Sequence, residues 1–459
     1  MSLRTTGRPS GPVSAELTAA YLDELDPSGA AVSAMLARLR PALADTGFAG
    51  RALSRPMFLT GAAVEGLRAD LTQLHNALTG LPDRLFGGDM AAFASAVGAT
   101  ASQAEIVLRG SGKVASRMGR ADFYLDDQGF RLLEINWGGA LGGLDSAILN
   151  RSMLEQPGLA SFAAEHRLGY VDPMAEMVHT LFTECGLARD SRPVVALTDW
   201  PASFATLEPR LRRNVVDYAR FGIEALPCHV GQLRYAEGRV WLVDRAIDVV
   251  YRLFLMEDLL DPAGPALIEP VLQAAERGEV AIFSPMDADL YGSKGALALL
   301  SDERHRDRYQ PAELASLDRI LPWTRMVRSG PVTVAGQQCE LYDHAIAEQA
   351  ELIIKPTMMH GGQGIVAGWL VSADEWREQL QAAMDGPYVL QRRIRPRPEA
   401  FPADSAAASL VDWTLTWGAF MSTNGYGGMY VRGSQDHDGT VNMSSGATGG
   451  CCFHPLPAD

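Results

Sequence analysis

The stretch RLLEINWGGALGG, which runs from Arg131 to Gly143, interrupts a buried strand with polar residues. Glu134 and Asn136 stand two positions apart, so in an extended chain both side chains lie on one face. Leu133 and Ile135 then lie on the other face. A glycine-rich segment follows at once. A strand that presents a carboxylate and an amide side by side needs a chemical reason, and the neighbouring segments suggest one.

The segment before this stretch predicts a β-hairpin. The stretch VASRMGRADFYLDDQGFRLLEIN changes to a period of two, and its turn DDQG ends at Gly129. A three-residue loop with a left-handed glycine fits this turn. The facing pairs are then Asp126 with Phe130, Asp122 with Glu134, and Arg120 with Asn136. The side chains of the last two pairs, Asp122 with Glu134 and Arg120 with Asn136, would then share one face of the hairpin. A two-residue loop would instead put Asp122 and Glu134 on opposite faces.

Two carboxylates that face each other across a strand pair repel, because their Cβ atoms lie about 5 Å apart. One of the two acids could hold a proton, or a hard cation could bridge them. The carboxylates of Asp122 and Glu134 and the carbonyl of Asn136 are oxygen ligands of the kind that Mg²⁺ prefers. The alternative is an exposed hairpin with polar residues outward, in which Arg120 pairs with one of the acids.

A lysine and a glycine loop occur later in the chain, in ELIIKPTMMHGGQGIVAG. Lys355 ends an apolar run and is expected at the end of a buried strand. Glycines in the segment His360–Gly364 allow backbone N–H groups to approach an anion, so a phosphate clamp is one interpretation and a turn with a surface lysine is the other. No GK[ST] follows, which excludes a Walker A motif. The strand YVLQ, ending at Gln391, could present backbone groups to a nucleotide base.

Composition narrows the class of protein. The 459 residues carry a net charge of −15, which disfavours nucleic acid or an anionic membrane as the main partner. No apolar run approaches the ~20 residues that a membrane span needs, and the N-terminus shows no signal core, so the cytoplasm is the expected location. Five cysteines without a CxxC pair argue against a zinc site.

Periodicity predicts four parts of the chain. Residues 1–112 form a helical N-terminal region, and residues 113–189 hold the hairpin followed by a helix near 145–154. Residues 190–290 alternate strand, helix and strand, which predicts a parallel, Rossmann-like α/β domain without a GxGxxG site. Residues 291–459 form a further α/β module with the lysine strand, the glycine loop and a helix over 373–384.

The acidic hairpin, the lysine strand with HGGQG, and the YVLQ strand together resemble the ATP-grasp superfamily of carboxylate–amine ligases. The ExN motif precedes the lysine strand, which is similar to the circularly permuted branch that includes glutathionylspermidine synthetase and eukaryotic glutathione synthetase. GSKGALALL, with Lys294, and IDVVYRLF, with Asp248 and Arg252, also resemble segments of this branch. The resemblance covers roughly 115–459 and implies an α/β (α+β), circularly permuted ATP-grasp fold with a Rossmann-like pre-ATP-grasp domain.

The resemblance also implies roles for individual residues. The expected metal ligands are Asp122, Glu134 and Asn136; the expected nucleotide contacts are Lys294, Lys355, His360, Gly361, Gly362, Gln363, Gly364 and Gln391; and the expected catalytic residues are Arg120 and Arg432. The glycines after Asn136 are expected to keep bulk away from a substrate beside the metals.

The implied reaction joins a small-molecule carboxylate to an amine, such as an amino acid, a peptide or a polyamine. It uses ATP and two Mg²⁺ and passes through an acyl phosphate. A homodimer is a further expectation. Two alternatives remain open from the residues, namely a phosphotransferase on the same fold and a non-catalytic nucleotide-binding protein.

Overall fold

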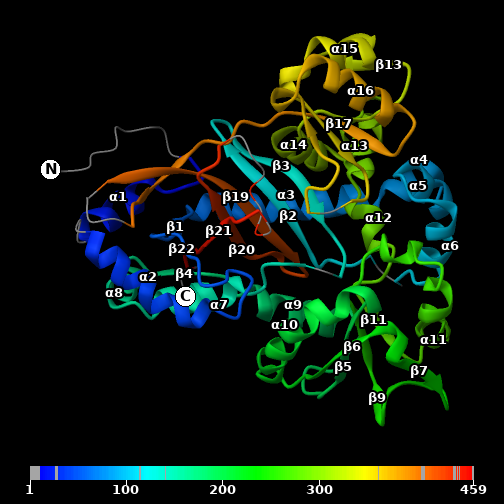
Figure 1. Ribbon diagram of the computed structural model, residues 1–459, viewed down its shortest axis with the longest axis horizontal. Coiled ribbons are helices and arrows are strands. Elements are labelled where there is room, and N and C mark those ends of the chain that lie inside the picture. The colour runs from blue at the N-terminus through cyan, green and yellow to red at the C-terminus, as the bar shows by residue number, and fades with distance from the viewer. Residues whose placement is uncertain are drawn as a thin grey trace.

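The computed structural model describes residues 11–25, 29–112, 115–139, 141–359, 361–404, 409–437, 441, 443 and 445–456. It has a mixed α/β architecture with several sheets (Figure 1). A six-stranded sheet lies in the middle of the view, a small antiparallel sheet with α15 and α16 lies at the top, and a parallel sheet lies at the lower right. In the described part of the chain, no helix combines the length and the apolar character needed to cross a membrane.

The six-stranded sheet is antiparallel and joins segments from distant parts of the sequence. Its order is β21-β20-β19-β2-β3, with β18 paired to β19. The strands are β2 (Gly119–Asp126), β3 (Gly129–Asn136), β18 (Glu399–Pro402), β19 (Leu410–Ser422), β20 (Gly425–Ser434) and β21 (Thr448–Gly450). Helix α3 (Gly61–Thr79) buries an apolar stripe at helical spacing that includes Leu67, Leu71 and Leu74, and it contacts β20.

The parallel sheet has the order β11-β10-β5-β6, with all four strands parallel. Its strands are β5 (Val194–Asp199), β6 (Glu224–His229), β10 (Val249–Arg252) and β11 (Ala281–Phe283), and its helices are α10 (Pro201–Ala219) and α11 (Gly264–Glu276). This confirms the predicted strand–helix–strand unit. The hairpin of β7 (Leu233–Ala236) and β8 (Arg239–Leu242) turns at Glu237 and Gly238, both left-handed, and β9 (Arg245–Ile247) extends it.

The small antiparallel sheet has the order β12-β17-β15-β16. Its strands are β12 (Thr324–Met326), β15 (Leu352–Pro356), β16 (Val366–Ala367) and β17 (Tyr388–Arg392), and the helices and hairpin around it are α13 (Lys294–Ser301), α14 (Pro311–Ile320), α15 (Leu341–Ala347), α16 (Ala373–Met384), β13 (Pro331–Val334) and β14 (Gln337–Glu340). Helix α16 begins where predicted, because the Ser372 side chain accepts a hydrogen bond from the Glu375 backbone. Trp376 and Leu380 pack with Ile354 and Leu390 of the sheet.

The N-terminal region is helical as predicted, but it also contributes a strand. Its helices are α1 (Ala15–Glu24), α2 (Gly29–Leu43), α3, α4 (Leu81–Phe86), α5 (Met90–Ala96) and α6 (Ala101–Arg109). Strand β1 (Met57–Phe58) pairs in parallel with β22 (Cys452–Pro455), which pairs with β4 (Leu168–Gly169). The remaining helices are α7 (Ser146–Leu154), α8 (Pro157–Glu165), α9 (Pro173–Glu184) and α12 (Ala288–Gly292). A two-residue strand has no periodic signature, so the sequence could not reveal this link between the ends of the chain.

The hairpin of β2 and β3 has the predicted pairing at the site but not at the turn. Asp126 pairs with Gly129, not with Phe130, so the loop contains only two residues. The register then shifts by one residue, since Asp122 pairs with Glu134 while Phe123 pairs with Leu132. Leu133 is therefore the extra residue of a β-bulge. The loop is one residue shorter than predicted, and the bulge adds one residue to β3. The two differences compensate, so Asp122 faces Glu134 and Arg120 faces Asn136 as predicted.

Candidate active site

A cavity of about 570 Å³ lies between the six-stranded sheet and the small antiparallel sheet. Nine predicted site residues line it: Arg120, Asp122, Glu134, Asn136, Lys355, Gly361, Gly362, Gln391 and Arg432. Gln363 and Gly364 belong to the adjoining turn but are not among the residues that line the cavity. His360 lies outside the described residues. Tertiary structure thus gathers into one cavity most of the residues that the sequence singled out.

Asp122 is the centre of a buried ionic network. Its side chain is 2% exposed. Arg120 donates to both of its oxygens, from Nε to Oδ1 at 2.7 Å and from Nη2 to Oδ2 at 2.9 Å. The Asn136 amide donates to Oδ2 at 3.1 Å. Burial by itself would raise the pKa of Asp122, but the guanidinium groups of Arg120 and Arg432 outweigh it and lower this pKa to about 2, so the carboxylate is ionised at neutral pH.

Arg432 approaches the same carboxylate from strand β20. Its Nη2 atom lies 2.8 Å from Oδ2 of Asp122, which is an ion-pair distance. Nε is buried without a hydrogen bond to the described residues, and the contact of Nη2 with Asp122 is an ion pair that helps to lower the pKa of that carboxyl. The contact with Asp122 is therefore mainly electrostatic. Arg432 keeps hydrogen-bonding capacity in a cavity, which is the usual mark of a group that receives an anion.

Glu134 is neutralised separately, by Lys294 at the start of α13. The Lys294 ammonium lies 3.2 Å from Oε2 of Glu134 and donates to the carbonyl of Met359 at 3.0 Å. Burial would raise the pKa of Glu134, and the positive charge of Lys294 lowers it below its ordinary value instead. The two facing acids of the hairpin thus coexist because each has its own cations. Lys294 was predicted to contact phosphates. In the structure its ammonium connects Glu134 with the backbone of Met359, just before the glycine loop.

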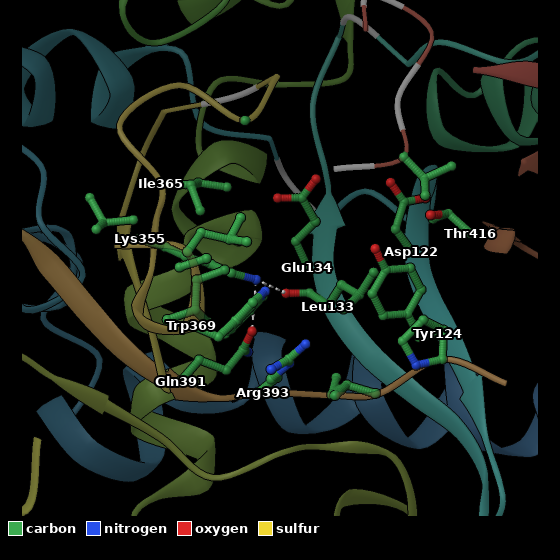
Figure 2. A pocket seen from close by; sticks show the side chains of 18 of the residues that line it. Asp122, Tyr124, Leu133, Glu134, Lys355, Ile365, Trp369, Gln391, Arg393 and Thr416 are labelled. Atoms are coloured by element: carbon green, nitrogen blue, oxygen red, sulfur yellow. Dashed lines mark hydrogen bonds between the residues drawn. The ribbon is translucent and has the colours of Figure 1, made fainter. Parts of the chain in front are cut away.

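Lys355 is buried at the end of β15 as predicted, and its side chain is fixed at both sides. Its ammonium donates to the carbonyl of the bulge residue Leu133 at 3.2 Å and to Oε1 of Gln391 at 2.7 Å (Figure 2). Gln391 in turn donates to Thr324. Burial lowers the pKa of Lys355 to about 8, against the opposing effect of Glu134. The side chain of Gln391 therefore positions Lys355, a role that the sequence analysis did not include.

The glycine loop and the glycines after Asn136 have different uses. Gly361, Gly362 and Gly364 are all left-handed, with φ of 68°, 82° and 67°, so the loop depends on glycine. A Cβ on Gly139 would lie 1.6 Å from the carbonyl oxygen of Arg252. Close packing of the chain after β3 against the end of β10 explains Gly139, rather than the predicted clearance for a substrate beside the metals.

Several cavity residues were missed. Leu133 lines the cavity beside Glu134, because the bulge turns it away from the side of Ile135 that was predicted. Tyr124 continues the period of Arg120 and Asp122 along β2, a signal that could have been followed. Trp369 follows β16 without any sequence signal. Its Nε1 is buried without a described partner, and the guanidinium of Arg393 lies 4.0 Å from its ring (Figure 2).

The lysines themselves form a signal that periodicity does not reveal. The chain contains 37 arginines but only three lysines, at positions 113, 294 and 355. Two of the three are buried at this site. A compact ammonium group can fit a confined place that a guanidinium fork cannot, so lysine is used where the cavity requires it.

Among the described residues, three carboxylate or imidazole ligand atoms come within 4.8 Å of one another only at Glu24, Glu165 and His166, of which the two acids are exposed. The cavity offers two carboxylates, from Asp122 and Glu134, together with the amide of Asn136. A cation held there would rely on these three side chains and on oxygens of a bound substrate.

Comparison with known proteins shows a likeness of fold to solved structures. No protein-family model and no curated protein matches the chain. The structure resembles that of a glutathione synthetase-like effector from Globodera pallida, solved in the apo form, with 13% identity, coverage of 87% of this chain and 89% of that chain, and a TM-score of 0.52. A protein assigned as a gamma-glutamylcysteine synthetase from Methylobacillus flagellatus has 12% identity, coverage of 83% and 86%, and a TM-score of 0.42. The first likeness extends over most of both chains and is one of fold.

Proposed function

We propose that the protein is an ATP- and Mg²⁺-dependent carboxylate–amine ligase of the ATP-grasp type. The observation that carries the proposal is the meeting, in one cavity, of a buried lysine, a pair of ionised acids and a buried arginine, Arg432, whose Nε has no hydrogen bond to the described residues. Phosphoryl transfer requires this combination, because it depends on neutralising charge and on orienting the reactants rather than on a protein nucleophile. The fold likeness to a glutathione synthetase-like protein agrees with it.

The cavity suits a nucleoside triphosphate in shape and polarity. Ile365 and Trp369 give one wall an apolar surface for a base (Figure 2), and Ile353 also lines the cavity. Lys355 stands between this wall and the acidic hairpin, where a phosphate chain would leave the base. The left-handed glycines Gly361 and Gly362 can turn backbone N–H groups toward phosphate oxygens.

The oxygen donors suit Mg²⁺. Glu134 and Asn136 face the cavity, and Asp122, which is ionised at neutral pH, could join them after exchanging its arginine partners. Bound Mg²⁺ would neutralise charge on the phosphates. We place one or two ions here, as the resemblance implies.

The chain's own residues would act on the acid substrate. Arg432, which is buried, pairs with Asp122 through Nη2 and has no hydrogen bond from Nε to the described residues, would bind its carboxylate or the phosphoryl group that it receives. Arg120, which also donates to the carbonyl of Gly142, would hold Asp122 and the chain after β3 in position. The carboxylate takes the terminal phosphoryl group of ATP, ADP leaves, and an amine displaces phosphate from the acyl phosphate to form an amide.

The organisation implied by the resemblance is part of the proposal. A circular permutation would account for the order of the acidic hairpin and the lysine strand, with a core divided between 113–189 and 291–459. The parallel sheet within 190–290 would be the Rossmann-like domain and, with the helices of 1–112, would shape the pocket for the second substrate. We also propose a homodimer acting on small molecules in the cytoplasm.

ADP release tests the function. Purified protein with Mg²⁺ and ATP would be screened against amino acids, small peptides and polyamines, singly and in acid–amine pairs. A ligase should release ADP with one pair and, with the acid alone plus hydroxylamine, should form a hydroxamate. Phosphorylated product without a hydroxamate would favour the phosphotransferase alternative.

Matched variants on one hairpin make the screen specific. Glu134→Gln removes a charge from the cavity, whereas Asp127→Asn removes one from the exposed turn of the same hairpin. We expect the first variant to lose ADP release and the second to keep it. Equal rates in both would contradict the site, and ATP binding without turnover in any pair would favour a non-catalytic nucleotide-binding protein.

A further inference from the structure

The charged groups around the acidic hairpin do not balance. Asp122 and Glu134 contribute two negative charges. The cations that contact them are Arg120, Arg432 and Lys294, and Lys355 is close enough to Glu134 to affect its charge state. Among the described residues that contact or electrostatically affect these two carboxylates, four cations against two acids leave an excess of two positive charges. A bare divalent cation is repelled by such a cluster, and an anion is attracted.

Both carboxylate oxygens of Asp122 are also already occupied by protein partners. Oδ1 accepts from Nε of Arg120, and Oδ2 accepts from Nη2 of Arg120 and from the Asn136 amide, with Nη2 of Arg432 at 2.8 Å. A metal ion that used Asp122 would have to displace one of these groups. On Glu134, one oxygen is likewise engaged by Lys294 at 3.2 Å.

The two arginines differ in how readily they could leave. Arg120 makes two hydrogen bonds to Asp122 and a third to the carbonyl of Gly142, so its guanidinium is held on several sides. Arg432 contacts Asp122 through Nη2 alone, at 2.8 Å, and its Nε has no hydrogen bond to the described residues. Arg432 is therefore the partner that can move to a new anion at the lower cost.

We propose that Arg432 masks Asp122 from metal ions until an anionic substrate group takes Arg432 away. Metal and anion then bind synergistically: each is bound more tightly in the presence of the other, as linkage requires. This inference rests on the proposed metal role of Asp122. The recruited anion is a phosphate or a carboxylate, because both accept a guanidinium fork.

Binding of Mn²⁺, which substitutes for Mg²⁺, tests the masking without any turnover. Protein-retained Mn²⁺ would be measured by ultrafiltration and electron paramagnetic resonance. We expect the wild type to retain little Mn²⁺ alone and to retain it at least about tenfold more tightly with inorganic triphosphate. Parallel samples with acetate would show whether a carboxylate has the same effect. This comparison of Mn²⁺ binding with and without an anion uses only the wild-type protein, so it does not depend on whether a variant folds.

Variants of Arg432 and Asp122 test whether these two residues cause the change in Mn²⁺ affinity. Arg432→Met removes the mask without adding a metal ligand, and it should bind Mn²⁺ alone roughly 10–100-fold more tightly than the wild type, the range in which groups around metal ligands alter affinity. Adding Asp122→Asn to this variant should abolish the gain. Arg392→Gln, at the cavity rim, removes an equal charge and should leave Mn²⁺ affinity near the wild-type value.

Wild-type protein that binds Mn²⁺ alone as tightly as Arg432→Met would overturn the masking. So would equal gains in Arg432→Met and Arg392→Gln, because the effect would then be one of net charge. If the expected Mn²⁺ pattern appears but no acid–amine pair releases ADP, the masking stands and the proposed reaction fails.

Discussion

Lys355 is expected to lose its proton near pH 8 in the ligand-free protein, because burial lowers its pKa from an ordinary 10.5 to about 8. Its side chain is buried at the end of β15, and Glu134 offsets part of the cost of burying the charge. Glu134→Gln should therefore lower the pKa of Lys355 further. A bound triphosphate should raise it, because the phosphate charges favour the ammonium form.

The magnitude follows from the two pKa values. A fall from 10.5 to about 8 corresponds to about 3 kcal/mol between the protonation states. Below pH 8 Lys355 is protonated in both the folded and the unfolded chain, so the folded protein bears the full cost. Between pH 8 and 10.5 the unfolded chain binds more protons, and the free energy of unfolding should rise with pH as far as Lys355 contributes. Above that window the cost is absent.

The composition makes the measurement practical. Because the chain has only three lysines, protein labelled with ¹³C at lysine Cε gives three side-chain signals. Lys355→Arg identifies the signal of interest by its disappearance. One signal should titrate near pH 8 and should move to higher pH when an ATP analogue and Mg²⁺ are added. Three signals that all titrate at pH 10 or above in the ligand-free protein would refute the burial of Lys355 in this cavity.

Three further predictions concern the same framework. Glu134→Gln should reduce ADP release at least about 100-fold, measured with the substrate pair found by the screen; near wild-type rates would exclude its metal role. Asp122→Asn should lower the free energy of unfolding in urea by about 3–5 kcal/mol, since it leaves buried guanidinium groups unpaired; an unchanged midpoint would contradict the network. Gly139→Ala should lower the melting temperature, as its Cβ would lie 1.6 Å from the carbonyl oxygen of Arg252. Gly158→Ala, with no atom within 4 Å of its Cβ, is the control and should melt like the wild type or slightly above it.

Local patterns were sufficient for the individual elements. The helix over 373–384, the lysine strand and the parallel strand–helix–strand unit were predicted from the pattern of apolar residues, and the structure has them. The pairing of Asp122 with Glu134 was also predicted, although the loop on which the prediction depended is one residue shorter. A second irregularity, the bulge at Leu133, restored the parity, and no local pattern indicated it.

The sequence by itself determined that Glu134 and Asn136 would share one face of their strand, and Arg120 and Asp122 one face of the neighbouring strand, because the alternation of side chains along a strand is a local property of the backbone. Only the tertiary structure decided which cations neutralise the two acids. Lys355 reaches the carbonyl of Leu133 across a separation of 222 residues, and Arg432 reaches Asp122 from a strand near the end of the chain. The strands and helices that bring these groups together meet through the packing of their apolar faces, so the partners of a buried charge are fixed by contacts that no single segment contains.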